Sequence, residues 1–353
     1  MRIFECDHCG QTIYFDNSVC VACGHRLGFA PEDTAMYALE DEKDGIWHKA
    51  DDPSRRFRLC ANAGLDVCNW LVDPESDEEF CLCCRHNNLI PDTTTDQGLN
   101  RFRRIVGAER HLFYSLLRWG IETPTRKADP ETGLVFDFLE DTVDASGNVT
   151  PAMTGHDNGK ISLRVAEADD VTREIVRDQM NEPYRTLLGH FRHEVGHYVW
   201  DRLVRDGGRL EAFRTIFGDE RQDYQEALER HYKNGPPPGW QDSFVSAYAA
   251  THPWEDFAES FAHALHIVDT LETAMAFGLL VSDANLHALG DPYRCSSGQQ
   301  LADAWVPLTL AMNAIHRSMG QRDFYPFVLA PAMIAKLDFV FTLLSGARDK
   351  AAA

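Results

Sequence analysis

The sequence predicts an α+β fold in two parts, a cysteine-rich module over residues 1–90 and a larger domain over residues 91–353. Two observations support this prediction. Nine of the ten cysteines lie within the first 84 residues. In the rest of the chain, strand-like segments come first and helix-like segments dominate later, which indicates a small sheet beside a set of helices. The polar segment 89–100 is the predicted linker between the two parts.

Composition narrows the class of protein. The chain has 353 residues, 44% of them hydrophobic, and a formal net charge of −21. The apolar fraction is sufficient for a buried core, while the negative charge disfavours binding to nucleic acid or anionic membranes. No apolar stretch is long enough to span a membrane, and residues 1–10 do not have the pattern of a secretion signal. We therefore expect a cytoplasmic protein with no membrane partner.

Two Cys-x-x-Cys pairs near the N-terminus have the spacing of a zinc ribbon, and the predicted ligands are Cys6, Cys9, Cys20 and Cys23. Each pair forms a tight turn that presents two thiolates, and four thiolates complete the tetrahedral shell of a zinc ion. In a reducing compartment, such clustering favours metal binding over disulfide bonds. Because four protein ligands leave no position for a substrate, the predicted role of this zinc is structural.

A second cysteine group predicts a second structural zinc, with Cys60, Cys68, Cys81 and Cys84 as its ligands. Cys83 and His86 lie in the same stretch, and the sequence leaves open whether either one replaces a ligand. A module of about 90 residues in short pieces would bury too little apolar surface to fold without metal. Zinc ribbons often contact protein or nucleic acid, and the acidic balance here favours a protein partner.

The larger domain is expected to contain strands over residues 133–141 and 160–168, joined by a loop over 147–159. One helix is expected before them, one in the middle of the domain and three after them. Their predicted ranges are 101–120, a middle helix from about Asn181–Pro183 to 206–208, 254–270, 300–318 and 331–345.

The middle helix carries the motif His193-Glu194-x-x-His197. Residues four apart share one face of a helix, so both imidazoles can bind one metal ion, which we expect to be a catalytic zinc. Glu194 lies beside them and can act as a general base on a water molecule that the metal activates.

A catalytic zinc needs a third protein ligand, and two candidates, Glu255 and Glu259, lie four residues apart on one predicted helix. One can bind the metal while the other accepts a hydrogen bond from a ligand histidine. Tyr248, just before this helix, could stabilise an oxyanion. Asp201 lies four residues after His197 and could orient that ring.

The stretch "HEVGHYVWDRL" followed by "YAATHPWEDFAESFA" resembles the gluzincin metallopeptidases, most nearly the catalytic domain of anthrax-type lethal factor. The whole chain resembles a bacterial family of zinc-binding metallopeptidases with an N-terminal zinc ribbon, through its cysteine pairs, "TGHDNGKISLRVAEADD" and "GQRDFYPFVLAPAMIAKLDFV". The resemblance implies a zincin-like domain, with a small sheet, an active-site helix and a helical C-terminal part. It also implies that His193, His197 and Glu255 bind zinc, that Glu194 is the base and Tyr248 the oxyanion donor, and that Glu259 supports a ligand.

In metallopeptidases of this kind, the strand before the zinc helix is an edge strand that pairs with the extended substrate. The residues expected there are Lys160, Ile161, Ser162, Leu163 and Arg164. We therefore predict a zinc metallopeptidase that cleaves a peptide or amide bond in a peptide or protein, with one catalytic and two structural zinc ions. Two alternatives stay open: a non-catalytic adaptor whose ribbons bind protein or RNA, and a hydrolase of a non-peptide amide conjugate.

Overall fold

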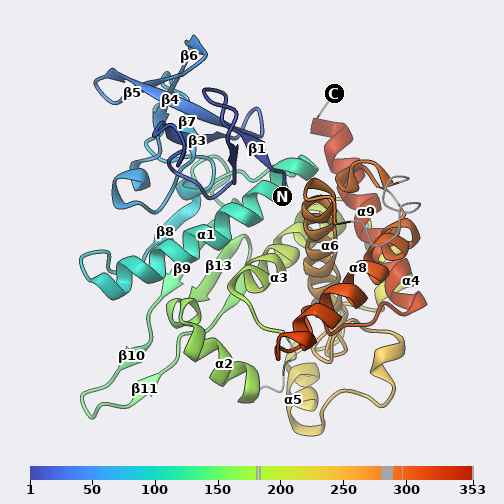
Figure 1. Cartoon of the computed structure of the whole chain (residues 1–353). Coiled ribbons are helices and arrows are strands. Elements are labelled where there is room, and N and C mark those ends of the chain that lie inside the picture. The colour runs from blue at the N-terminus through green and yellow to red at the C-terminus, as the bar shows by residue number, and fades with distance from the viewer. Residues whose placement is uncertain (180–181, 183, 280–288, 296, 352–353) are drawn as a thin grey trace. The chain divides into compact units, whose positions relative to one another are not determined.

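The computed structural model describes residues 1–353 except 180–181, 183, 280–288, 296 and 352–353 (Figure 1). The chain forms two compact units, and each is described separately. The first unit contains residues 1–118 and 122–176, and the second contains residues 119–121 and 177–353. This division differs from the predicted boundary at residue 90, because the first unit extends beyond the cysteines and includes a helix and a second sheet.

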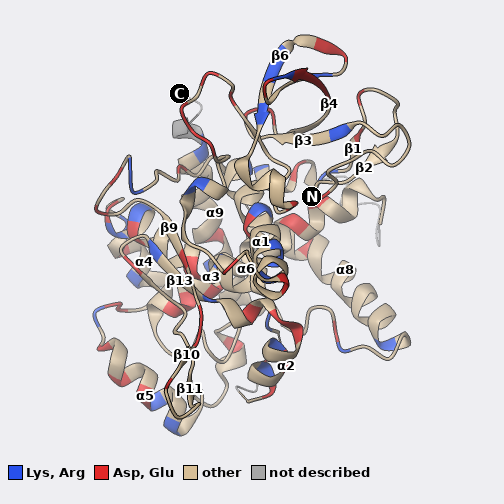
Figure 2. Ribbon diagram, turned by 90° about the vertical axis from the view of Figure 1, so that its left-hand side faces the viewer, with Lys and Arg blue, Asp and Glu red and all other residues tan. Residues whose placement is uncertain are grey.

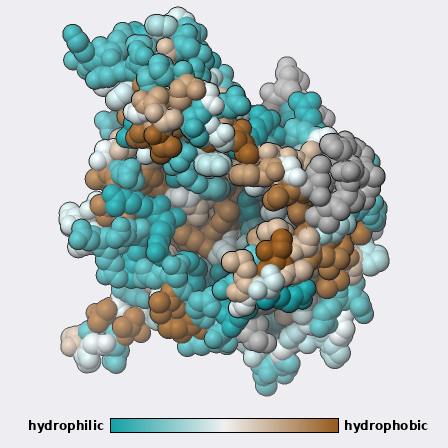
Figure 3. Space-filling model, viewed as in Figure 1, coloured by the Kyte–Doolittle hydropathy of each residue, from teal (hydrophilic) through white to brown (hydrophobic). Residues whose placement is uncertain are grey.

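The cysteine-rich part of the first unit is built from short antiparallel strands. A small hairpin, β1–β2, precedes a five-stranded sheet in the order β3-β4-β5-β6-β7. The bounds are β1 Phe4–Glu5, β2 Thr12–Ile13, β3 Arg26–Ala30, β4 Ala35–Lys43, β5 Ile46–Lys49, β6 Asp52–Leu59 and β7 Leu71–Val72. Acidic residues line the end of β4 and basic residues line β6 (Figure 2), and Arg56 Nε lies 2.8 Å from Glu42 Oε2. On the face shown in Figure 3, hydrophilic residues cover the outer end of this part, and some hydrophobic residues are visible closer to the rest of its unit.

The second sheet of this unit has four strands in the order β12-β13-β9-β8, and β9 pairs in parallel with both of its neighbours. The bounds of the elements in this part are β8 Asn87–Leu89, α1 Asp96–Trp119, β9 Val135–Leu139, a hairpin of β10 Thr142–Val143 and β11 Val149–Thr150, β12 Gly155–Asp157, β13 Lys160–Arg164 and α2 Asp170–Gln179. The predicted linker 89–100 therefore holds the last residue of β8 and the first turn of α1.

Helix α1 joins the two sheets of the first unit through a shared aromatic core. Tyr114 lies on one side of α1, with its ring centroid 5.5 Å from that of Phe15 in the cysteine-rich part. Phe113 lies 5.0 Å from His86 and 6.3 Å from Phe136 on β9. Because these rings are buried together, the cysteine-rich part and the second sheet form one compact unit.

The prediction that residues 160–164 form an edge strand is wrong. Strand β13 lies inside its sheet, with β9 along its whole length on one side and β12 along residues 160–162 on the other, so neither side is a free edge over those residues. The cause is a tight hairpin at Asn158–Gly159, where both residues have positive φ. An Asn-Gly pair is a strong hairpin signal, and it lies in the segment that was predicted to be a loop.

The second unit is helical. The predicted helices over 254–270, 300–318 and 331–345 are confirmed. The short helices α4 and α5 were not predicted. The bounds are α3 Leu187–Val199, a π-helical turn η4 Trp200–Arg205, α4 Leu210–Phe217, α5 Tyr224–Asn234, α6 Pro253–Ala276, α8 Gly298–Ser318 and α9 Pro331–Ala351. Helix α3 begins at Leu187 with Thr186 as its N-cap, and the predicted start at Asn181 and Pro183 falls on residues outside those described.

Helix α6 is the central element of the second unit, and α3, α4, α8 and α9 pack against it (Figure 1). Helix α3 approaches α6 closely at Gly196, where an added Cβ would lie 2.9 Å from the Cα of Ala258. Only glycine fits at such a crossing, so this residue lets the two helices that carry the predicted zinc ligands approach each other. Among the described residues, no helix combines the length and the apolar character needed to cross a membrane.

Candidate functional site

The central motif lies in α3, and its two histidines face the same way. Their ring centroids are 4.9 Å apart, one helical turn along the same face. The N-cap Thr186 accepts a hydrogen bond from the backbone N–H of Gly189 at 3.0 Å, which fixes the start of α3. The histidines are therefore held on a capped helix packed against α6.

Glu255 lies in the first turn of α6 and points its carboxylate at both histidines. Its Oε2 is 2.9 Å from His193 Nε2 and 3.4 Å from His197 Nε2. One donor atom from each of the three residues lies within 4.8 Å of the others. In a tetrahedral zinc site with bonds of about 2.0–2.2 Å to nitrogen and oxygen, ligand atoms lie roughly 3.4 Å apart. The spacing of these three side chains fits a zinc ion.

The second carboxylate of α6, Glu259, binds the opposite nitrogen of His193. Its Oε1 lies 2.7 Å from His193 Nδ1, and its Oε2 accepts a 2.6 Å hydrogen bond from the hydroxyl of Ser246. Burial opposes ionisation of Glu259, but the hydrogen bond and charge of His193 outweigh it and lower its pKa to about 2. An ionised Glu259 leaves Nε2 as the metal-facing atom of His193.

Tyr224, on α5, holds the other oxygen of Glu255. Its hydroxyl donates a 2.6 Å hydrogen bond to Glu255 Oε1, which leaves Oε2 directed at the histidines. Burial and the nearby charge of Glu255 raise the pKa of Tyr224, so the phenol stays protonated and remains a donor. Neither Tyr224 nor Ser246 was predicted, because each lies outside any motif and is brought to the site only by packing.

The two predicted catalytic residues, Glu194 and Tyr248, lie next to the candidate ligands. Glu194 is 8% exposed, and it interacts with the charges of both His193 and His197. Burial raises its pKa, and the two histidines act in the opposite direction. The ring centroid of Tyr248 is 5.8 Å from that of His193. Burial and then Glu255 raise the pKa of Tyr248, so its hydroxyl is a hydrogen-bond donor at neutral pH.

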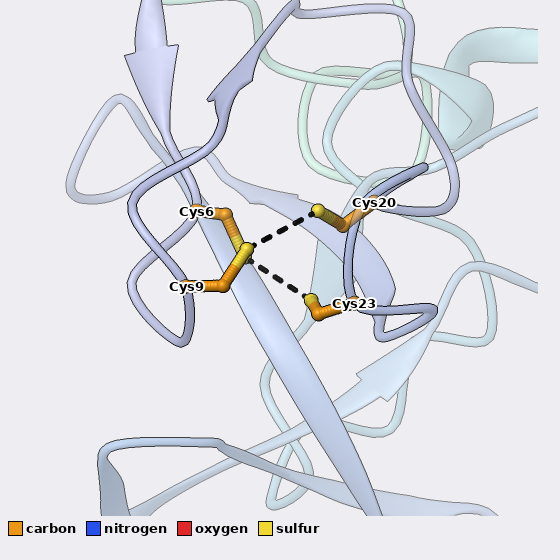
Figure 4. A group of neighbouring side chains, drawn as sticks. All are labelled: Cys6, Cys9, Cys20 and Cys23. Atoms are coloured by element: carbon orange, nitrogen blue, oxygen red, sulfur yellow. Dashed lines mark hydrogen bonds between the residues drawn. The ribbon is translucent and has the colours of Figure 1, made fainter.

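The structure brings the first four cysteines together in the geometry of a metal site (Figure 4). The Sγ atoms of Cys6 and Cys23 are 3.7 Å apart, and so are those of Cys9 and Cys20. At a Zn–S bond length of about 2.3 Å, a tetrahedral shell separates sulfur atoms by roughly 3.8 Å. A disulfide would need about 2.05 Å. The four thiols therefore fit zinc.

The second cysteine group has the predicted members, and its donor atoms lie within 4.8 Å of one another: Cys60, Cys68, Cys81 and Cys84. All four are buried, and the Sγ atoms of Cys68 and Cys81 are 3.7 Å apart. Cys83 and His86 are not part of this group. His86 instead has its Nδ1 at 2.9 Å from the carbonyl oxygen of Leu134. This arrangement favours the four predicted cysteines over Cys83 or His86 as ligands, and their binding of zinc stays a prediction.

Comparison with known protein families agrees with both kinds of site. Residues 3–95 match a zinc-ribbon domain, and residues 98–343 match the family described as "Putative zinc-binding metallo-peptidase". The chain belongs to this family. The metallopeptidase match spans all three candidate ligands of the His-His-Glu cluster, and the ribbon match spans both cysteine groups.

Relatives of this zinc-binding metallopeptidase family member occur in mycobacteria. Uncharacterized proteins from Mycobacterium bovis and from two strains of Mycobacterium tuberculosis are 44% identical to it over 347 residues. The alignment covers 98% of this chain and 95% of each relative, so the ribbon and the helical part occur together in them. No solved structure matches the chain.

The remaining predicted site residue is Asp201, which was expected to orient the ring of His197. It lies in the π-helical turn η4 that follows α3, and its Oδ1 accepts a 2.8 Å hydrogen bond from Arg205 Nη1. Its carboxylate is close enough to interact with the charge of His197. That it orients the His197 ring stays a prediction.

Proposed function

We propose that the protein is a zinc-dependent metallopeptidase whose catalytic zinc is held by His193, His197 and Glu255. The main support is the position of Glu255 Oε2, which lies within 3.4 Å of an Nε2 atom of each histidine. Two imidazoles and one carboxylate are a ligand set of catalytic zinc sites, in which the fourth position stays open for water or substrate. The two structural zinc ions would occupy the two cysteine groups.

The candidate catalytic residues have separate tasks in this mechanism. A zinc ion held by His193, His197 and Glu255 would supply an acidified water and a Lewis acid for the carbonyl group of the bond to be cleaved. Glu194 takes a proton from the attacking water and passes it to the amine that leaves. Tyr248 donates a hydrogen bond to the carbonyl oxygen as negative charge develops there. The products are a carboxylate and an amine, so water is the only other reactant.

The decisive experiment compares the zinc-loaded wild type with Glu194→Gln on a peptide mixture of broad sequence, with new peptide termini detected by mass spectrometry. The substitution removes a base but not a ligand, so zinc content should be unchanged while new termini appear only with the wild type. Equal cleavage by both proteins would contradict the role of Glu194. Absence of cleavage by the wild type would contradict a peptide substrate and favour the hydrolysis of another amide.

A non-catalytic adaptor is the competing function. The buried position of Glu194 beside the histidines counts against it, because a structural zinc site gains nothing from a buried carboxylate that is not a ligand. A protein partner for the cysteine-rich part and a cytoplasmic location stay predictions.

A further inference from the structure

A group of histidines and a carboxylate lies on the cysteine-rich part, beside the first cysteine group but with no residue in common with either cysteine group. Residues His8, His25 and Glu40 each offer one donor atom, and these atoms lie within 4.8 Å of one another. None of the three is assigned to the zinc sites described above.

The strand register explains how two of these side chains meet. Arg26 of β3 pairs with Leu39 of β4, so the next residues outward, His25 and Glu40, lie opposite each other. His25 Nε2 is 3.5 Å from Glu40 Oε1. Glu40 also pairs directly with His48 of β5, whose Nε2 is 4.0 Å from the other carboxylate oxygen. Glu40 therefore lies between two imidazoles.

The first cysteine turn supplies the remaining histidine. His8 lies between Cys6 and Cys9, and its ring centroid is 3.9 Å from that of His25 with the planes at 30°. The neighbouring residue Asp7 fixes this turn over β4, because its Oδ1 accepts a 2.7 Å hydrogen bond from the backbone N–H of Ala38. The donor nitrogens of His8 and His25 lie within 4.8 Å of each other, which is close enough for both residues to contribute to one metal site.

We propose that His8, His25 and Glu40 form a further metal site for an exchangeable divalent transition ion such as Zn²⁺, Ni²⁺ or Co²⁺. Imidazole nitrogen suits these ions, and the 3.5 Å separation of His25 Nε2 and Glu40 Oε1 fits the roughly 3.4 Å expected between ligands of a tetrahedral ion. The Glu40 side chain is 47% exposed, so the ion keeps open positions and exchanges with solvent, unlike an ion enclosed by four thiolates.

This site depends on the first structural zinc. His8 lies within the first cysteine turn, and the carbonyl oxygen of His25 accepts a 2.9 Å hydrogen bond from the N–H of Cys20. Zinc binding by the cysteines fixes both turns and so positions both histidines. The exchangeable ion should therefore bind only when the first cysteine site is filled.

The test is a Ni²⁺ titration of the full-length, zinc-loaded protein by equilibrium dialysis, with tightly bound zinc measured in parallel. We expect the wild type to bind one more Ni²⁺ equivalent than His25→Ala. Glu40→Gln, which leaves the cysteine turns unaltered, should weaken this equivalent by more than about 100-fold, beyond the 10–100-fold typical of residues that only support a ligand. Co²⁺ in this site should show no thiolate charge-transfer band.

The matched control is His111→Ala. His111 also pairs with one carboxylate, since its Nε2 is 3.0 Å from Asp16 Oδ2, but the structure describes no second imidazole beside that pair. This variant should retain the extra equivalent. Equal Ni²⁺ stoichiometry in the wild type, His25→Ala and Glu40→Gln would overturn the proposal. An equal loss in His111→Ala would also overturn it, because binding would then be a general property of surface histidines.

Discussion

At the scale of single residues, two chemically identical carboxylates in the candidate site differ in the partners that surround them. Glu255 and Glu259 are both carboxylates on one face of α6, yet Glu255 faces the Nε2 atoms of two histidines and Glu259 faces the Nδ1 atom of one. Tyr224 and Ser246 fix this division by donating to the outward oxygen of each carboxylate. The proposed ligand Glu255 and the proposed supporting residue Glu259 therefore differ in their partners and not in their own chemistry.

Replacement of the two carboxylates should distinguish their roles. Glu255→Ala should lose the zinc of the His-His-Glu cluster, because it removes a ligand. Glu259→Ala should retain this zinc with an affinity reduced about 10–100-fold, the usual cost of losing a residue that orients a ligand. Competition for zinc with a chromophoric chelator measures the zinc affinity of both variants. Equal losses in the two variants would contradict the assignment.

Replacement of Tyr224 and of Tyr248 should have different effects on zinc binding and on catalysis. Tyr224→Phe removes the hydrogen bond to Glu255 and should weaken zinc binding by about 10–100-fold. Tyr248→Phe should leave zinc affinity unchanged and cost about 2.7–4 kcal/mol of transition-state stabilisation if its hydroxyl is the main oxyanion donor. Zinc affinity and kcat/KM, measured on both variants with any cleaved peptide, provide the comparison. A reversed pattern would make Tyr224 the oxyanion donor.

At the scale of elements, the site depends on how closely α3 and α6 approach. The motif on α3 places its histidines one turn apart, but Glu255 can reach them only because Gly196 lets the backbones come close. The N-cap residues Thr186 and His252 fix the first residues of α3 and α6, respectively. They therefore fix the positions of the candidate ligands along the two helices.

Gly196→Ala should therefore disturb the site without removing a ligand. Its Cβ would lie 2.9 Å from the backbone of Ala258, so the helices must separate, with a loss of about 1–3 kcal/mol in unfolding free energy and weaker zinc binding. Gly346→Ala on α9 is the control, because its Cβ would meet no atom within 4 Å. That change should be neutral or stabilising by about 0.5–1 kcal/mol. Denaturant melts and zinc competition measure the difference, and an undisturbed Gly196→Ala would contradict the close crossing.

At the scale of the whole molecule, the chain forms two compact units, and each contains its own candidate metal sites. The cysteine groups lie in the first unit, and the His-His-Glu cluster lies in the second. A truncation at residue 90 would remove β8 from its sheet and separate α1 from the aromatic core it shares with the cysteine-rich part. Point substitutions therefore test each candidate metal site with less disturbance of the fold than truncation does.

Elemental analysis after extensive dialysis should find three tightly bound zinc ions per chain. The double change Cys6→Ser and Cys9→Ser should reduce this to two and destabilise the first unit, while zinc at His193 and His197 remains because its ligands belong to the other unit. His193→Ala should also give two, with both cysteine sites filled. Loss of the His-His-Glu zinc in the soluble cysteine variant would show that the two units fold as one.

The sequence alone determined the features of this protein that depend on residues close together in the chain. The Cys-x-x-Cys turns, the i and i+4 spacing of His193 and His197 and the long amphipathic helices are local patterns, and the structure contains each of them. Only the tertiary structure decided what joins distant segments: Tyr224 on Glu255, Ser246 on Glu259 and the interior position of β13. The physical reason is that periodicity encodes which face of an element is buried, whereas the partner on that face is chosen by packing between segments far apart in the chain.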